Sequence, residues 1–223
     1  MPLPDERPLR AAPIVVGVCA ALLYSNFLLD WVLRGFTGMG EVVSLLEAPG
    51  QPNATLLRVT DVICAVLVVT LLPAVRRRLP TGVWREVFVG GTLVFALGAA
   101  LAAVVATSCG SGIPCDGSGE ELVKGVHEAS SIVSDTALYV GAAAAWLSVR
   151  VLGPAWFKRV AWWFVWIGGL ASTLVFAWFH STEDPAWAVG ASQRVHIACI
   201  SGWILCLGLL AAHPPRTDGP GHG

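Results

Sequence analysis

Charged residues are scarce in this sequence, and their scarcity is the first constraint on its fold. Only 13% of the 223 residues are Asp, Glu, Lys or Arg, whereas 55% are hydrophobic, and the mean hydropathy is +0.69. A soluble domain carries about 25% charged residues. The deficit argues against a water-exposed domain and against a nucleic-acid partner, and it favours a protein whose helices lie in a membrane.

The N-terminus lacks the pattern of a cleaved signal peptide. Its first apolar segment contains Asn26 and Asp30 and has no small-residue cleavage site, so we expect a retained helix. Six apolar segments approach the ~20 residues that a helix needs to cross a bilayer. They predict an all-α, polytopic bundle of six transmembrane helices in a single domain, 1–212, with a disordered, Pro- and Gly-rich cytoplasmic tail, 213–223. The segments are 12–34, 57–75, 87–107, 129–150, 160–180 and 193–212.

Basic residues are fewer on one side of this predicted bundle than on the other. Ten of the 14 fall in the terminal segments and in the two short turns between the second and third, and the fourth and fifth, apolar segments. Positive residues mark the cytoplasmic side of a membrane protein, so both termini are predicted to be cytoplasmic. We expect a multi-pass protein of the inner (plasma) membrane of a bacterium. The ten residues are Arg7, Arg10, Arg76, Arg77, Arg78, Arg85, Arg150, Lys158, Arg159 and Arg216.

No CxxC pair and no His-x-x-x-His pair occurs, which weakens the case for zinc. Cys109 and Cys115 instead bracket a short loop on the side predicted to be extracytoplasmic. An oxidising compartment and this spacing favour a local disulfide. We therefore expect no cofactor, and zinc bound by His127, His196 and a carboxylate remains the less favoured alternative.

The clearest functional signal is a run of polar residues where the fourth apolar segment begins. His127, Ser131 and Asp135 are four residues apart, which places them on one face of a helix. Ionisable groups at membrane depth are costly and usually face a bundle interior or a watery cavity. Other polar residues lie at the same predicted depth in other segments: Asp30, Asp61, His180, Gln193, Arg194 and His196.

Three chemistries could use such a cluster. A buried carboxylic acid can donate a proton to a lipid or isoprenoid, a His-rich site can bind zinc, and a polar pocket can bind or pass a solute without catalysis. Arg194 could also pair with Asp135 or Asp61 in a purely structural ion-pair network. The helical order of His127, Ser131 and Asp135 resembles membrane hydrolases of the ceramidase and adiponectin-receptor type, but their His-x-x-x-His pair is missing here.

Several short motifs resemble an uncharacterised family of six-helix bacterial and archaeal membrane proteins. They are Pro114-Cys115-Asp116-Gly117, Val126-His127 at a helix start, and Gln193-Arg194 with Trp203 nine residues later. That family is in turn distantly similar to the FRAG/DRAM/Sfk group, some of whose members are linked to lipid handling. This sequence has Gly117 and Gln193 where the family has Pro and Glu. The resemblance implies a six-helix architecture and no defined activity.

Some small membrane proteins of actinobacteria are terpene cyclases, and the size and membrane acids of this chain are compatible with that activity. No aspartate-rich motif for a prenyl diphosphate is present, so such an enzyme would start by protonation. The sequence therefore predicts a membrane-embedded enzyme acting on a lipid or isoprenoid, or alternatively a non-catalytic binding, transport or scaffolding protein. The predicted catalytic residues are Asp135, His127, Glu128 and Arg194, and the predicted substrate-binding residues are Asp30, Asp61, Ser131, His196 and Trp203.

Overall fold

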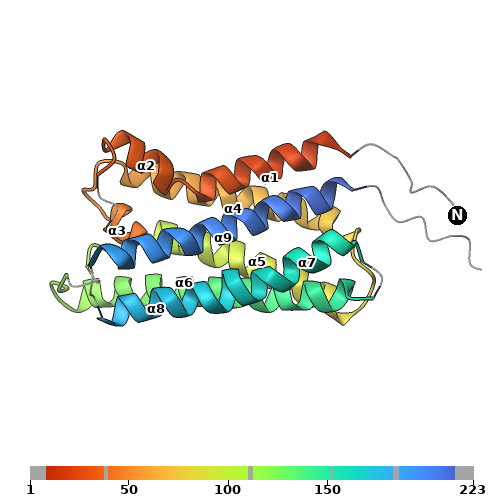
Figure 1. Ribbon diagram of the computed structural model, residues 1–223. Coiled ribbons are helices and arrows are strands. Elements are labelled where there is room, and N and C mark those ends of the chain that lie inside the picture. Colours follow the sequence, from red (N-terminus) through yellow and green to blue (C-terminus); the bar gives the residue numbers. More distant parts are fainter. Residues whose placement is uncertain (1–8, 38–39, 110–112, 152, 183–185, 214–223) are drawn as a thin grey trace, which may run out of the picture.

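The computed structural model describes residues 9–37, 40–109, 113–151, 153–182 and 186–213, and every extended element among them is a helix. The predicted tail lies outside the described residues from position 214 onward. The helices run side by side along one long axis (Figure 1). They are α1 (Ala11–Tyr24), α2 (Phe27–Leu33), α3 (Val43–Leu46), α4 (Ala54–Arg76), α5 (Val83–Val104), α6 (Ser118–Val149), α7 (Ala155–Trp163), the π-helix η1 (Phe164–Ala171), α8 (Ser172–Thr182) and α9 (Ala186–Ala212).

The apolar helices indicate a multi-pass membrane protein, as the sequence predicted. Helices α4, α5, α6 and α9 and the continuous run Ala155–Thr182 are each long and apolar enough to cross a membrane. Helices α1 and α2 make one further span if they are counted together across a bend of 55°. The described part of the chain therefore contains five or six candidate spans.

The bend between α1 and α2 interrupts a segment that the sequence predicted as one helix over 12–34. The backbone turns at Ser25 and Asn26, whose polar side chains both find partners on other helices. Asn26 donates from Nδ2 to Leu57 O at 3.0 Å, Thr60 Oγ1 at 3.0 Å and Asp61 Oδ1 at 2.7 Å. These bonds to α4 hold the break in place, as inserted side-chain bonds do at helix kinks.

Different helix ends and connections gather at the two ends of the bundle (Figure 1). At one end, called here the α3 end, lie α3, the end of α2 and the start of α6. The opposite end, the terminal end, is where α1 begins and α9 ends. The terminal end carries the arginine-rich turn, where Arg78 donates to Ala211 O at 3.4 Å.

Helix α6 begins at Ser118, well before the apolar segment that the sequence predicted from residue 129. Two acidic residues, Glu120 and Glu121, lie in its first turn, where they are favoured by the helix dipole. Glu120 also accepts a hydrogen bond from the Asp116 backbone N–H at 2.7 Å, which closes the helix start. The polar first turns are therefore helical, and the face carrying His127 starts inside the helix rather than at its mouth.

Helices α5 and α6 pack very closely, because α5 presents glycines to α6. A Cβ on Gly91 would lie 2.6 Å from Ala137 O, and one on Gly98 would lie 2.9 Å from Ser134 Cβ. Ser134 reinforces the contact by donating to Phe95 O at 2.8 Å. Small residues allow such approach between membrane helices. The contact fixes the rotation of α6, and so directs the face with Ser131 and Asp135.

An aromatic cluster fills the half of the bundle toward the terminal end. Trp203 stacks on Phe164 at a centroid distance of 4.7 Å and on Phe157 at 5.5 Å, and Phe88 packs edge-on at 6.2 Å. Trp203 is 1% exposed. The residue that the sequence placed in the substrate site thus lies in the packed core, and the open space of the bundle is found at the other end.

Candidate functional site

A cavity of about 410 Å³ lies in the half of the bundle toward the α3 end. Ligand sites in proteins typically enclose 300–1,000 Å³. Seven helices contribute to its walls, namely α1, α3, α4, α5, α6, α8 and α9, so the fold gathers polar residues from most of the chain. The titratable residues in its lining are Tyr24, Glu47, Asp61, His127, Asp135, Tyr139, His180 and His196.

Five of the residues singled out in the sequence line this cavity: Asp61, His127, Ser131, Asp135 and His196. The predicted face of α6 is therefore directed into a shared space. The other four lie elsewhere. Glu128 is exposed and pairs with Lys124 at 3.7 Å, and Trp203 lies in the aromatic core. Asp30 and Arg194 belong to a separate network in the loop that carries α3.

The central contact of the cavity joins α6 to α9. Nε2 of His196 lies 3.0 Å from Oδ2 of Asp135, and the His196 side chain is 7% exposed, against 35% for Asp135. The imidazole is thus enclosed while the carboxyl group faces the open space. The sequence proposed Arg194 as a partner of Asp135, whereas the structure gives that place to His196.

Hydrogen bonds engage both ring nitrogens of His196. Ser172 Oγ lies 2.9 Å from Nδ1 of His196, and Ser172 also hydrogen-bonds to Gly168 O. Oδ2 of Asp135 contacts Nε2 on the other side of the ring, where an imidazole N–H can donate to the carboxylate. The ring is therefore held from both sides.

A π-helix positions Ser172 for this role. Ser172 immediately follows η1, the wide-turned segment Phe164–Ala171. Segments of π-helix interrupt the normal carbonyl pairing and occur often at functional sites. The sequence gave no sign of η1 beyond the pair Gly168-Gly169. A Cβ on Gly169 would meet the ring of Tyr139 at 2.8 Å, so glycine there lets that ring approach.

Tyr139 completes the group around the imidazole. Its hydroxyl oxygen lies 3.1 Å from Nε2 of His196, and its ring lines the cavity. The hydroxyl can donate to Nε2 or accept from it, depending on the tautomer of the imidazole. Tyr139 was not predicted as a site residue, although it lies one helical turn after Asp135 and so shares its face.

His127 is fixed in one tautomer by the end of α5. Its Nδ1 lies 3.0 Å from Ala102 O and 3.1 Å from Val105 O, and both partners can only accept, so Nδ1 carries the proton. These carbonyls lie in the last turn of α5 and just beyond it, where helix geometry leaves them without partners. The ring is 7% exposed and lines the cavity, so its Nε2 presents a lone pair there.

A second acidic group comes from the loop, and the sequence did not predict it. Glu47, just after α3, is 6% exposed and hydrogen-bonds to Asp61 of α4. Burial raises the pKa of Glu47 to about 7, although the hydrogen bond from Asp61 and the charge of Arg58 oppose the shift. In the sequence, the only feature that distinguishes Glu47 is that this acidic residue directly follows Leu45 and Leu46 in an amphipathic turn.

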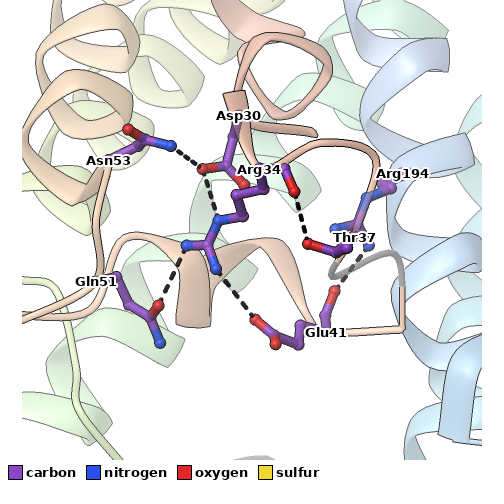
Figure 2. A network of polar contacts seen from close by, with 7 residues as sticks. All are labelled: Asp30, Arg34, Thr37, Glu41, Gln51, Asn53 and Arg194. Atoms are coloured by element: carbon purple, nitrogen blue, oxygen red, sulfur yellow. Dashed lines mark hydrogen bonds and ion pairs between the residues drawn. The ribbon is translucent and has the colours of Figure 1, made fainter. Parts of the chain in front are cut away.

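Figure 2 shows the network that holds this loop in place. Asp30 accepts from Arg34 Nε at 3.0 Å and from Asn53 at 2.8 Å. Arg194 of α9 donates to Glu41 O at 2.7 Å, and its guanidinium carbon lies 5.9 Å from the centre of the Phe27 ring. These contacts join α2, the loop and α9. Asp30 and Arg194, predicted for the site itself, instead fix the wall that carries Glu47.

Gln193 attaches α3 to the same wall. Its Oε1 accepts from the backbone N–H of Val43 at 2.6 Å, at the first turn of α3. Val43, Ser44 and Glu47 all line the cavity. The short helix therefore closes the cavity toward the α3 end, and one residue of α9 sets its position.

The predicted disulfide is confirmed. Cys109 and Cys115 are joined, with a Cα–Cα distance of 5.0 Å. Cys109 is 2% exposed and lies just after the carbonyls that bind His127. The disulfide constrains the connection between α5 and α6 close to the cavity wall.

The zinc alternative named His127, His196 and a carboxylate as ligands. Within the part of the chain that the structure describes, no three His, Cys, Asp or Glu side chains are grouped so as to hold a metal ion. His196 is already bound through both ring nitrogens, to Ser172 and Asp135. The expectation of no cofactor stays a prediction.

The fold and the cavity define a multi-pass helical membrane protein with a partly open cavity lined by both polar and apolar side chains. A family model described as "Protein of unknown function (DUF998)" matches residues 17–210, and the chain belongs to this family. The expected membership of an uncharacterised family is thus confirmed, while no link to the FRAG/DRAM/Sfk group is shown. No curated protein and no solved structure matches the chain.

Proposed function

We propose that this protein is a membrane-embedded enzyme that performs acid–base chemistry on a lipid or isoprenoid held in the cavity. The observation that carries the proposal is the contact between Asp135 and His196, with the carboxyl group open to the cavity and the imidazole held on its other side by Ser172. Proton donors and acceptors positioned in this way contribute about 10²–10⁴-fold to a rate.

The residues divide into distinct roles. Asp135 is the acid that reaches substrate, because its carboxyl group is the exposed member of the pair. His196 reprotonates it, and Ser172 acts as a positioning residue. His127 is the base, because its Nε2 carries a lone pair toward the same space. Glu128 has no part in this scheme, since its carboxylate pairs with Lys124 on the outer face of α6.

Substrate access supports a lipid-like molecule. The cavity extends between α6 and α8 to residues whose side chains lie on the outer surface of the bundle, including Ile132, Thr136, Thr173 and Ala177. Ile132 is 66% exposed. In a membrane this surface faces acyl chains, so an amphiphile can enter sideways with its head group toward Asp135.

An isoprenoid would follow the same path and would be activated by protonation. A carbocation formed in the cavity needs aromatic faces to stabilise it. Phe176, Tyr24 and Tyr139 line the cavity and offer them. The tryptophan expected to serve this purpose, Trp203, lies outside the lining, so the aromatic support for cyclisation is smaller than the ten tryptophans of the sequence imply.

The positions of the arginines support one orientation of the bundle in the membrane. With the arginine-rich terminal end in the cytoplasm, the bundle has six spans, both termini are cytoplasmic and the cavity lies beneath the outer leaflet of the plasma membrane. The disulfide then lies on the oxidising side, as its chemistry requires. The substrate is accordingly drawn from the outer leaflet.

The proposal is tested by turnover in a native lipid mixture. The purified protein is placed in liposomes made from total membrane lipids of the source organism, and lipids consumed and formed are followed by mass spectrometry. We expect at least one lipid to be converted by the wild-type protein and conversion to fall at least 100-fold in Asp135→Asn. Glu128→Gln is the matched control and should keep full activity. Equal conversion by the wild type and Asp135→Asn would refute the proposal.

A second candidate, a non-catalytic protein that binds or moves a lipid or solute, is favoured by one observation. Asp61 and Asn26 bind each other across the break in the first span, so part of the polar cluster serves to hold α2 against α4. Under this alternative, Asp135→Asn changes stability or lipid content, and no lipid is converted by any variant. The turnover experiment therefore separates the two candidates.

A further inference from the structure

The cavity is acidic. Three carboxyl groups line it, those of Glu47, Asp61 and Asp135, together with the imidazoles of His127, His180 and His196, whereas no Lys or Arg occurs among its described lining residues. Arg58 is near enough to act on Glu47, but its side chain belongs to a separate groove between α4 and α5. A negatively charged head group inside the cavity would therefore meet like charges at low dielectric, where repulsion is strong.

Two of these carboxyl groups lie together. Glu47 and Asp61 hydrogen-bond to each other, and both line the cavity. His127 lines it as well and uses Nδ1 to donate to Ala102 O and Val105 O. A ligand that complements two adjacent carboxyl groups brings hydrogen-bond donors and positive charge, which is the description of an ammonium group.

The position of the Glu47–Asp61 pair fits such a group. Asn26 donates to Asp61 at 2.7 Å from one side, and the cavity lies on the other. The two carboxyl groups lie within hydrogen-bonding reach of each other, so an ammonium head group in the cavity can donate to both. The loop network of Asp30, Arg34 and Arg194 holds Glu47 in position for this contact.

We infer that the cavity binds an amphiphile with a primary amine head group, with Glu47 and Asp61 as its counter-ion and its alkyl chain in the opening between α6 and α8. The inference rests on the proposed function in that it names the substrate class of the same site. It excludes head groups that carry phosphate or diphosphate, because the lining offers three carboxyl groups and no guanidinium or ammonium partner among its described residues.

The test compares three probes with the same chain and different head groups: dodecylamine, dodecanol and dodecyl phosphate. Binding to the full-length protein in phosphatidylcholine nanodiscs is measured by isothermal titration calorimetry, with empty nanodiscs subtracted. We expect dodecylamine to bind at least tenfold more tightly than either other probe. Tighter or equal binding of dodecyl phosphate would overturn the inference, and this comparison needs no variant.

Two variants locate the site. Glu47→Gln and Asp61→Asn should each weaken dodecylamine binding at least tenfold and leave dodecanol binding within twofold. Glu128→Gln removes the same charge from an exposed position at the same end of the bundle and should bind dodecylamine as the wild type does. Unchanged dodecylamine affinity in both cavity variants, with the proteins folded by circular dichroism, would also overturn the inference.

The outcomes distinguish this inference from the proposed function. If dodecylamine binds as expected but no lipid is converted, the cavity is an amine-lipid binding site and the enzyme proposal fails alone. If a lipid without an amine is converted in an Asp135-dependent manner and dodecylamine does not bind, the enzyme proposal stands and the amine inference fails.

Discussion

Asp135 and His196, 61 residues apart in the chain, face each other at 3.0 Å between α6 and α9. The sequence placed both residues at the same depth but named Arg194 as a possible partner of Asp135 or Asp61. An imidazole partner changes the chemistry, because histidine exchanges protons near neutral pH whereas arginine stays charged.

The pair predicts energetic coupling between its members. Asp135→Asn and His196→Gln should each destabilise the protein, and the double variant should lose less than the sum, with a coupling energy of about 0.5–3 kcal/mol. The reason is that the second substitution removes a group that has already lost its partner. Denaturant unfolding in detergent micelles, followed by circular dichroism, measures the four proteins of the cycle.

The control for this cycle is Arg194→Gln. Arg194 contacts the Glu41 carbonyl in the loop network, and Asp135 lies in the cavity, so their substitutions should be additive within about 0.5 kcal/mol. Strong non-additivity between Asp135→Asn and Arg194→Gln would contradict the arrangement described here.

Glu47 predicts a specific pH dependence of stability. Its pKa is about 7 in the folded protein, against an ordinary value of 4.5, so the folded state binds more protons than the unfolded state between these values. Stability from this group is therefore greatest below pH 4.5 and is lost as the pH rises through 7. The melting temperature of the wild type should fall between pH 5 and pH 8 by more than that of Glu47→Gln. Parallel profiles would show that Glu47 is not buried as described.

The disulfide should stabilise the loop between α5 and α6. Cys109 and Cys115 are separated by six positions. A disulfide that closes so short a loop lowers the conformational entropy of the unfolded chain and stabilises the folded protein by about 2 kcal/mol. Reduction with dithiothreitol should lower the melting temperature of the wild type. A Cys109→Ser, Cys115→Ser double variant should match the reduced wild type and show no response to the reductant.

Adjacent glycines should respond oppositely to the same substitution. Gly91→Ala places a Cβ 2.6 Å from the Ala137 carbonyl, whereas Gly90→Ala meets nothing within 4 Å. We expect Gly91→Ala to lower the melting temperature by several degrees and Gly90→Ala to be neutral or stabilising, since alanine favours a helix by up to about 1 kcal/mol. Equal effects would mean that α5 is rotated relative to this description.

The sequence predicted the architecture better than the site. Long apolar segments identify membrane helices because a bilayer sets their length, and the spacing of His127, Ser131 and Asp135 identified one wall because helix geometry fixes it. Contacts between residues on different helices could not be predicted in this way. The contact between Asp135 and His196 depends on how α6 and α9 are rotated, and glycine contacts elsewhere in the bundle set that rotation.

Two further differences between the predicted and the observed site involve the loop that carries α3. Glu47 approaches Asp61 because the segment before α4 folds back over the bundle, and no periodicity in the sequence encodes that path. Arg194 was predicted for the site because it opens the last span, yet it contacts the same loop from outside. The π-helix that positions Ser172 also lacks a composition signal of its own.

The stacked rings of Trp203, Phe157 and Phe164 lie outside the lining of the cavity and fill the bundle toward the terminal end. A solute that travelled along the bundle axis from the cavity to the terminal end would have to pass these rings, so conduction by that route would require them to separate. A molecule that is bound or modified in the cavity and leaves by the way it entered needs no such rearrangement of the core.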